Sequence, residues 1–545
     1  MEEFAALLDR LVLTPARNGK LTLLVDYFRD TPDPDRGLAL AAITGDLDIA
    51  NVKPAMLRGL VATRIDEQLF AFSYDYVGDL AETISLVWST DEPVRANAVP
   101  TLGDIVTSLE RASRSDAVQL VEKWLDQLDA SARYALLKLV TGGLRIGVSA
   151  RLAKQALAQF GAVDVTEIEE LWHGLKPPYQ PLFAWLEKTE EKPQNLAAAP
   201  FRPVMLSTPL EEPDYARITT DAYAAEWKWD GIRVQLTTEG GQRRIYSRTG
   251  DDISHAFPDI ADFMTFEGTL DGELLIARSA GAGVEIGAFG DLQQRLNRKT
   301  VSAKQLESHP AFVRLYDLLF DGKDDIRALP FAERRAHLET FAKQLEPTRF
   351  DLSPLVPFEA FGDLVDLRKN PPHPIIEGLM LKQRSSAYVP GRPKGPWFKW
   401  KRDPFTIDAV LVYAQRGHGK RSSYYSDYTF AVWTGPETEP YLVPVGKAYF
   451  GFTDEELKQL DAFVRNNTTE RFGPVRSVRA EPAHGLVLEV AFEGLNRSKR
   501  HKSGVAMRFP RISRLRWDKP PIEADRLETL EAMLRDLERT DLLST

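Results

Sequence analysis

The run Glu226–Arg233, with the sequence EWKWDGIR, holds the residues best suited to nucleotide chemistry. Lys228 begins the pattern K-x-D-G-x-R, and a lysine amine can attack an α-phosphate and become covalently linked to it. Gly231 lets the backbone come close to a neighbour, and Arg233 can hold negative charge on a phosphate or sugar. The alternative is a lysine on a solvated strand edge beside a D-G turn.

Five other charged residues lie beside expected strands or turns. Arg248 precedes a glycine turn and could bind a phosphate or ribose edge; the alternative is an exposed hairpin arginine. Glu273 and Glu377 adjoin apolar strand residues, where a carboxylate is costly unless it is paired or metal-bound. Facing one site, they could position Mg²⁺ (or Mn²⁺), which prefers oxygen ligands; the alternative for each is a surface acid paired with a neighbouring base. Lys399 and Lys401 share one strand face, which suits a triphosphate but also a solvated lysine face.

The segment 508–519 (RFPRISRLRWDK) is strongly basic, and it follows another basic run at 497–502. Phe509 and Trp517 are interleaved with the cations, which is typical of a surface that contacts phosphates. A solvated charged edge is the alternative.

Three regions with different sequence patterns must position these residues. Residues 1–195 carry apolar positions at helical spacing, and Ser149 is a good N-cap, so we expect an all-α domain. Residues 204–402 alternate short strands, turns and helices, which predicts an α+β domain built on antiparallel sheet. Residues 403–545 predict a β-barrel of the OB type.

Two helices are expected within the barrel region, at 454–463 and at 522–537. The proline-spaced stretch 189–203 predicts a linker between the first two domains.

Composition narrows the class of protein further. A chain of 545 residues is expected to form about three domains. The absence of cysteine excludes disulfides, thiolate zinc sites and cysteine nucleophiles. No apolar run approaches the roughly 18 residues of a membrane helix, and the acidic start is unlike a signal peptide, so we expect a cytoplasmic protein without membrane contact. The net charge of −10 argues against non-specific coating of nucleic acid but leaves room for a local basic surface.

In chain order, these motifs resemble the ATP-dependent DNA ligases of the three-domain kind found in bacteria, archaea and eukaryotes. The matching segments are Lys228–Arg233 (adenylation motif), Arg248 (R-x-G), Asp271–Glu273 (D-G-E), Tyr316–Phe320 (aromatic motif), Glu377–Lys382 (E-G-x-x-x-K), Lys399–Lys401 (paired lysines), Arg508–Lys519 (barrel motif) and Leu144–Gly147 (L-R-I-G). Tyr316 stands where the family has phenylalanine, although tyrosine stacks as well. The loop 391–395 is one residue longer than the family pattern, which leaves the role of Arg392 open.

The resemblance implies a helical DNA-binding domain, an adenylation (nucleotidyltransferase) domain and an OB-fold domain that together seal nicks. It implies Lys228 as the nucleophile and ATP and Mg²⁺ as cofactors, with Glu273 and Glu377 as metal ligands. The implied nucleotide-binding residues are Glu226, Arg233, Arg248, Glu273, Tyr316, Arg392, Lys399, Lys401, Arg516, Asp518 and Lys519. The last three would swing over to orient pyrophosphate and then swing away so that DNA can enter.

Glu226 stands two residues before Lys228, so on a strand both side chains point to one face. Its carboxylate could accept from the adenine 6-amino group and repel the oxygen of guanine, which favours ATP over GTP. The alternative is a strand-face acid paired with a lysine.

The expected partner is nicked double-stranded DNA, bound by a monomer without sequence preference. The helical domain would contact the backbone in the minor groove through helix N-termini and the turn 142–149. An RNA ligase, a GTP-dependent capping-type nucleotidyltransferase and a non-catalytic nick-binding protein are the alternatives. An NAD-dependent DNA ligase is disfavoured because the chain lacks the four cysteines of its zinc site.

Overall fold

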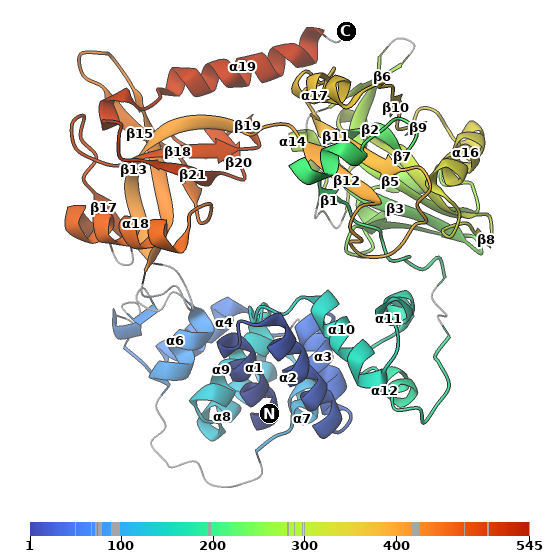
Figure 1. Cartoon of the computed structure of the whole chain (residues 1–545). Coiled ribbons are helices and arrows are strands. Elements are labelled where there is room, and N and C mark those ends of the chain that lie inside the picture. The colour runs from blue at the N-terminus through green and yellow to red at the C-terminus, as the bar shows by residue number, and fades with distance from the viewer. Residues whose placement is uncertain are drawn as a thin grey trace. The chain divides into compact units, whose positions relative to one another are not determined.

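The computed structural model is shown in Figure 1. It describes residues 1–49, 51–66, 68–70, 73–74, 79–88, 99–194, 198–280, 283–287, 289–296, 298, 300–416, 424–472, 475–498 and 501–543. Two compact units are present: one is formed mainly by Met1–Leu196, and the other by most of the chain from Ala197 to Thr545. The boundaries 1–195, 204–402 and 403–545 stay a prediction.

The first unit is helical, and its described residues between 1 and 194 contain no strand. Its helices are α1 (Glu2–Leu13), α2 (Arg17–Asp30), α3 (Asp35–Thr44), α4 (Pro54–Ala62), α6 (Leu80–Val87), α7 (Leu102–Arg111), α8 (Arg114–Gln127), α9 (Ala130–Thr141), α10 (Ala150–Gly161), α11 (Val165–Leu171) and α12 (Gln180–Leu186). They bury one apolar core that includes Phe4, Phe28 and Phe183. The expected cap at Ser149 is present, because its hydroxyl accepts from the Leu152 N–H at 3.2 Å. The all-α prediction is therefore confirmed.

The middle of the chain forms two sheets. A five-stranded sheet has the order β1-β12-β11-β2-β10, and a larger one has the order β4-β3-β5-β7-β8 with β6 and β9 attached. The strands are β1 (Thr208–Pro209), β2 (Tyr223–Trp229), β3 (Ile232–Glu239), β4 (Gln242–Ser247), β5 (Gly268–Ala280), β6 (Gly283–Ile286), β7 (Ala311–Asp321), β8 (Asp324–Asp325), β9 (Phe350–Leu352), β10 (Leu355–Val356), β11 (Ile376–Gln383) and β12 (Trp397–Lys401). Pairing is antiparallel as expected, except that β1 joins β12 and β9 joins β7 in parallel.

Helices complete this α+β region. They are α13 (Pro258–Ala261), α14 (Phe289–Gln293), α15 (Ala303–Ser308), α16 (Phe331–Phe341) and α17 (Phe361–Lys369). Lys228 of β2 pairs with Gly378 of β11, and its side chain is only 23% exposed and forms an ion pair with Glu377. The alternative of a solvated strand edge for Lys228 is therefore wrong.

The C-terminal region is a β-structure around an apolar core that includes Phe430, Val490 and Phe492. Its elements are β13 (Phe405–Arg416), β14 (Tyr425–Thr434), β15 (Tyr441–Ala448), α18 (Asp454–Asn467), β16 (Thr468–Phe472), β17 (Val475–Val478), β18 (Val487–Phe492), β19 (Gly494–Arg497), β20 (Val505–Arg508), β21 (Arg511–Arg516) and α19 (Leu527–Leu543). Strand β18 joins β13 to β21, while β19 and β20 form a separate hairpin.

The two predicted helices of this region differ from the structure at their ends. The inserted helix extends to Asn467, because Leu460 and Val464 continue its buried face. The tail helix begins at Leu527 and not at Ile522. The backbone before it is held by β13, since Asp408 and Asp525 are joined by two hydrogen bonds of 2.8 Å.

Within the described residues, we find no helix with both the length and the apolar character needed to cross a membrane.

Candidate active site

A pocket of about 510 Å³ opens in the second unit, a volume typical of small-molecule sites. The predicted site residues that line it are Glu226, Lys228, Arg233, Arg248, Glu273, Tyr316, Glu377, Arg392, Lys399 and Lys401. They come from β2, β3, β5, β7, β11, β12 and two loops. Residues as far apart in the sequence as Glu226 and Lys401 thus meet around one cavity.

Lys228 is held inside this pocket by a carboxylate. Its Nζ lies 2.7 Å from Oε2 of Glu377, and the Nζ of Lys401 lies 3.4 Å from the same oxygen. Burial raises the pKa of Glu377, but the two lysine ammonium groups outweigh burial and hold that pKa below its usual value. Glu377 is therefore ionised at neutral pH and can fix the position of the Lys228 amine.

Glu226 is almost fully buried, with 2% of its surface exposed. Its Oε2 lies 2.8 Å from Nζ of Lys382, and its Oε1 lies 3.4 Å from Nη1 of Arg335. The alternative of an acid paired with a lysine thus describes a real contact, yet this carboxylate also lines the pocket. Burial raises the pKa of Glu226, and the Lys382 ammonium opposes that rise.

Arg233 is bound mainly by the protein itself. Its guanidinium makes a bidentate pair with the fully buried Asp271, at 3.0 and 2.5 Å, and donates to the Met205 carbonyl at 2.6 Å. The Tyr388 hydroxyl donates to the same carboxylate at 2.8 Å. Arg233 therefore stiffens the pocket wall, with fewer donors left for a phosphate than its motif suggests.

Three other cations of the pocket differ from Lys228 and Arg233 in that they have no carboxylate partner among the described residues. Within the part of the chain that the structure describes, no carboxylate lies within ion-pair distance of Arg248, Arg392 or Lys399. Burial, together with nearby cations of which Arg392 is the first, lowers the pKa of Lys399. Like charges gathered without counter-charges favour an anionic ligand.

The net charge of the pocket supports the same conclusion. Its lining residues include eight lysines and arginines against four aspartates and glutamates, which gives +4. The whole chain carries −10, so positive charge is concentrated locally. This balance suits a nucleoside triphosphate.

Glu273 and Gly231 meet where β3 begins. The Gly231 N–H donates to Oε1 of Glu273 at 3.2 Å. A Cβ at position 231 would lie 2.5 Å from the Leu274 carbonyl oxygen, so only glycine fits. We expected the backbone at Gly231 to come close to a neighbour, and in the structure that neighbour is strand β5. Burial raises the pKa of Glu273 to about 7, and the Lys228 and Arg233 cations oppose the rise.

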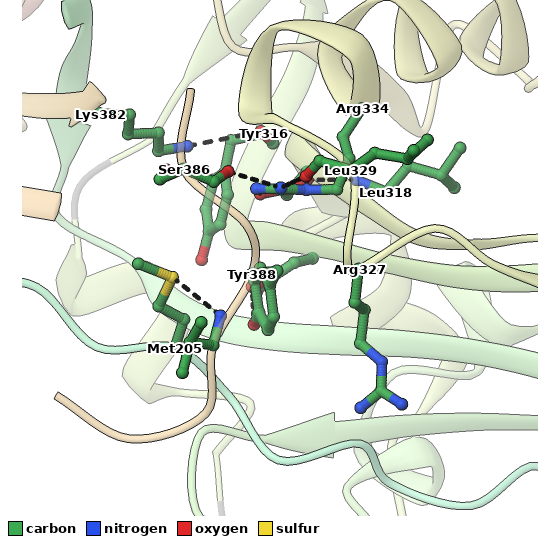
Figure 2. A network of polar contacts seen from close by, with 12 residues as sticks. Met205, Tyr316, Leu318, Arg327, Leu329, Arg334, Lys382, Ser386 and Tyr388 are labelled. Carbon is green, nitrogen blue, oxygen red and sulfur yellow. Dashed lines mark hydrogen bonds and ion pairs between the residues drawn. The ribbon is translucent and has the colours of Figure 1, made fainter. Parts of the chain in front are cut away.

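The aromatic wall is formed by Tyr316, near Lys382 (Figure 2). The Lys382 ammonium lies 4.5 Å from the Tyr316 ring centroid and donates to its backbone carbonyl at 3.4 Å. Figure 2 also shows Arg334 reaching the Leu329 and Ser386 carbonyls, at 2.6 and 3.0 Å. The same guanidinium pairs with Asp317, which is next to Tyr316. Tyr316 therefore stands on a strand that buried ion pairs hold in place.

Arg516, Asp518 and Lys519 do not line this pocket. Asp408 binds both cations, at 3.2 Å from Arg516 and 2.7 Å from Lys519, while Asp518 pairs with Arg516 at 2.9 Å. The barrel motif instead contributes Arg508, whose guanidinium forms an ion pair with Asp230.

The comparisons with known proteins agree with this geometry. Three family models match in succession: "DNA ligase N terminus" over residues 1–158, "ATP dependent DNA ligase domain" over 204–401 and "ATP dependent DNA ligase C terminal region" over 421–519. A probable DNA ligase of Koribacter versatilis is 30% identical over 98% of this chain and 96% of its own length. The chain belongs to the ATP-dependent DNA ligase family. This ligase therefore uses ATP and acts on DNA nicks, and the resemblance drawn from the motifs is confirmed.

Other relatives give the same result. DNA ligase 1 of Korarchaeum cryptofilum is 29% identical over 97% of each chain. The solved structure titled Pmar-Lig_PreS3 has a TM-score of 0.59 and 14% identity, with 94% of this chain and 99% of that chain covered. That likeness covers the helical, α+β and β regions of the chain, and it confirms the predicted fold class. The family models and the curated relatives favour DNA ligation over RNA ligation, capping and non-catalytic nick binding.

Sequence reasoning missed three residues that shape the site. Arg335 contacts Glu226 from α16, Tyr388 contacts Asp271, and Arg508 contacts Asp230. The charge of Arg508 was noticed only as part of a basic run. No local spacing relates any of the three to its partner.

Proposed function

We propose that Lys228 is the residue of this ligase that takes AMP from ATP. The observation that carries the proposal is a lysine held by an ionised carboxylate in a pocket of net charge +4. Its Nζ must first lose a proton to become a neutral amine. The amine would then attack the α-phosphorus, so that the phosphoramide N–P bond forms as the P–O bond to pyrophosphate breaks. The 5′-phosphate of the nick would then take the AMP, and the 3′-hydroxyl would displace it as the phosphodiester forms.

The adenine end of the pocket is proposed to be formed by Glu226 and Tyr316. Tyr316 offers a ring face for stacking, and Glu226 an acceptor for the 6-amino group. An ionised carboxylate cannot donate to the guanine oxygen, which would give preference for ATP over GTP.

The phosphate end is proposed to be formed by the cations. Arg248, Arg392 and Lys399 lack carboxylate partners among the described residues, and Lys401 shares Glu377 with Lys228. These groups would neutralise the triphosphate and stabilise charge on the leaving pyrophosphate.

Arg516, Asp518 and Lys519 are proposed to join in orienting pyrophosphate. Both cations must first leave Asp408, which binds them in this structure. A conformational step of the barrel would therefore precede their action.

Magnesium is proposed to bind at Glu377 and Glu273. Both carboxylates line the pocket, whereas no cluster of three or more His, Cys, Asp or Glu side chains is found among the described residues. Two carboxylates are enough for Mg²⁺, which binds to one or two carboxylates of the protein and takes its other oxygen ligands from substrate phosphates and water. When bound, the ion would neutralise phosphate charge. Glu273 could alternatively accept a hydrogen bond from the ribose.

The helical unit is proposed to bind the DNA backbone through the turn that precedes α10. Gly142, Gly143, Arg145 and Gly147 all have positive φ and are exposed, while Leu144 and Ile146 between them are buried. The exposed backbone and the N-terminus of α10 suit phosphate oxygens.

This mode of binding predicts sequence-independent affinity that falls with salt. Titration of labelled nicked duplexes of different sequence would test it, and a strong preference for one sequence would refute it. We further propose that the ligase acts as a monomer in the cytoplasm, near the nucleoid of a prokaryote.

Labelling of the protein tests the central proposal. The chain is incubated with α-labelled ATP, GTP or NAD and Mg²⁺, and then chased with nicked DNA. We expect label from ATP that moves to the nick, no label in Lys228→Ala, and unchanged labelling in Lys458→Ala, a control at an exposed residue of α18. Label from GTP alone, or label that persists in Lys228→Ala, would refute the proposal.

A further inference from the structure

The carboxylate of Glu226 is held by two cations, one on each oxygen. Lys382 binds Oε2 at 2.8 Å, and Arg335 approaches Oε1 at 3.4 Å. Lys382 lines the pocket and can touch a ligand directly. Arg335 is not among the described lining residues, although it is buried with 7% of its surface exposed. It therefore contacts Glu226 from behind the pocket.

Arg335 is itself fixed in orientation. Its Nη1 donates to the Ser353 carbonyl at 2.8 Å, and its Nε donates to Glu339 at 2.8 Å. Ser353 lies just before β10, and Leu355 of β10 is the backbone partner of Glu226. The helix α16 thus contacts both the side chain of Glu226 and the segment that pairs with its backbone.

We propose that Arg335 is a positioning residue for adenine recognition, because it fixes the orientation of the Glu226 carboxylate. This inference rests on the proposed role of Glu226 as the reader of the 6-amino group. An ionised carboxylate only accepts hydrogen bonds, whereas a protonated one can also donate to the oxygen of guanine. Arg335 would therefore support both the affinity for adenine and the rejection of guanine without touching either base.

The charges that face Glu226 agree with this role. Burial raises the pKa of its carboxyl, Lys382 and Arg335 oppose the rise, and Asp317 of β7 adds to it. The pKa of Glu226 is raised overall, and removing the Arg335 cation would favour the protonated form further. A lone lysine could also pull the carboxylate out of its present orientation.

The test compares ATP with purine riboside triphosphate, which lacks the 6-amino group, in the formation of the lysyl-nucleotide adduct. In the parent protein we expect a clear preference for ATP. In Arg335→Met and Arg335→Gln we expect that preference to fall by about tenfold, the size typical of a lost hydrogen bond to a charged group. The loss should appear in KM with kcat nearly unchanged, and GTP should become a better substrate.

Three controls separate positioning from general damage. Arg335→Lys, which keeps the charge, should restore part of the preference. Arg295→Met removes another buried arginine of this unit, paired with Asp259 at 2.6 Å and away from the pocket, and should leave the preference unchanged. Arg335→Gln retains a donor for the Ser353 carbonyl, so it tests the charge if Arg335→Met fails to fold.

The outcomes are distinguishable. If the parent prefers ATP and the Arg335 variants keep the same preference, the inference is overturned while the role of Glu226 stands. If the parent does not distinguish the two triphosphates, Glu226 does not read the amino group and both proposals fall. In a double-mutant cycle, Glu226→Gln should make the effect of Arg335→Gln on the preference disappear; additive effects would contradict action through Glu226.

Discussion

Replacing Glu273 by glutamine should remove a pH-dependent loss of stability that this carboxyl imposes on the fold. Burial raises its pKa from 4.5 to about 7, the Lys228 and Arg233 cations lower it, and Glu377 adds to the rise. In the unfolded chain the group returns to its ordinary value. The folded state therefore binds the proton more tightly than the unfolded state.

The sign and the size follow from this difference. Well below pH 4.5 the carboxyl is protonated in both the folded and the unfolded state. At that pH its burial causes no pH-dependent loss of stability. As the pH rises to about 7, only the unfolded state releases the proton, and stability falls. The full difference between 4.5 and about 7 corresponds to about 3.4 kcal/mol, and the partial contact of the side chain with solvent reduces the expected effect to at most about 3 kcal/mol. Above that range the loss is complete and constant.

Calorimetry in metal-free buffer can measure the effect. Glutamine keeps an oxygen for the Gly231 N–H, so the two proteins differ mainly in titration. At pH 4.5 their unfolding temperatures should nearly coincide, and at pH 8 the glutamine variant should unfold several degrees higher. Parallel curves across this range would refute the reasoning, since they would show that Glu273 has the same proton affinity in both states.

Three further changes have defined outcomes. Lys228→Arg keeps the positive charge but removes the amine nucleophile, so mass spectrometry should show no AMP adduct; an adduct would mean another nucleophile. Tyr316→Leu should raise KM for ATP roughly tenfold or more through lost stacking, whereas Tyr316→Phe should not, and equal kinetics for both would exclude a stacking role. Asp271→Asn leaves Arg233 as a buried unpaired charge, so denaturant unfolding should show a loss of about 3–5 kcal/mol; a loss below about 1 kcal/mol would mean that water reaches the guanidinium.

The relative positions of site residues that are close in sequence could be predicted, because the geometry of a strand fixes which side chains share a face. The alternation along β2 puts Glu226 and Lys228 on one face, and the alternation along β12 does the same for Lys399 and Lys401. The structure has all four lining one pocket. The helical, α+β and barrel regions were predictable for the same reason, since each has its own periodicity over many residues.

Contacts between distant residues could not be predicted in this way. Asp408 and Lys519 are 111 residues apart and bind at 2.7 Å, which holds the end of the barrel motif away from the pocket. The start of α19 was mispredicted for a related reason. Propensity favours a helix from Ile522, but Pro521–Glu523 form only a short 3-10 turn, and hydrogen bonds between Asp408 and Asp525 hold the backbone between that turn and α19.

Helix α16 shows most clearly why local patterns are insufficient at this site. Two consecutive arginines on a charged helix are typical of a solvated surface. Here Arg334 is fully buried against Asp317 of β7, and Arg335 is buried against Glu226 of β2. Adjacent helix positions point about 100° apart, so one helix can hold two different strands through two different carboxylates. The burial of an arginine is costly unless a carboxylate pairs with it. The burial of both arginines therefore depends on contacts between α16 and the strands β7 and β2, which the sequence of the helix alone does not predict.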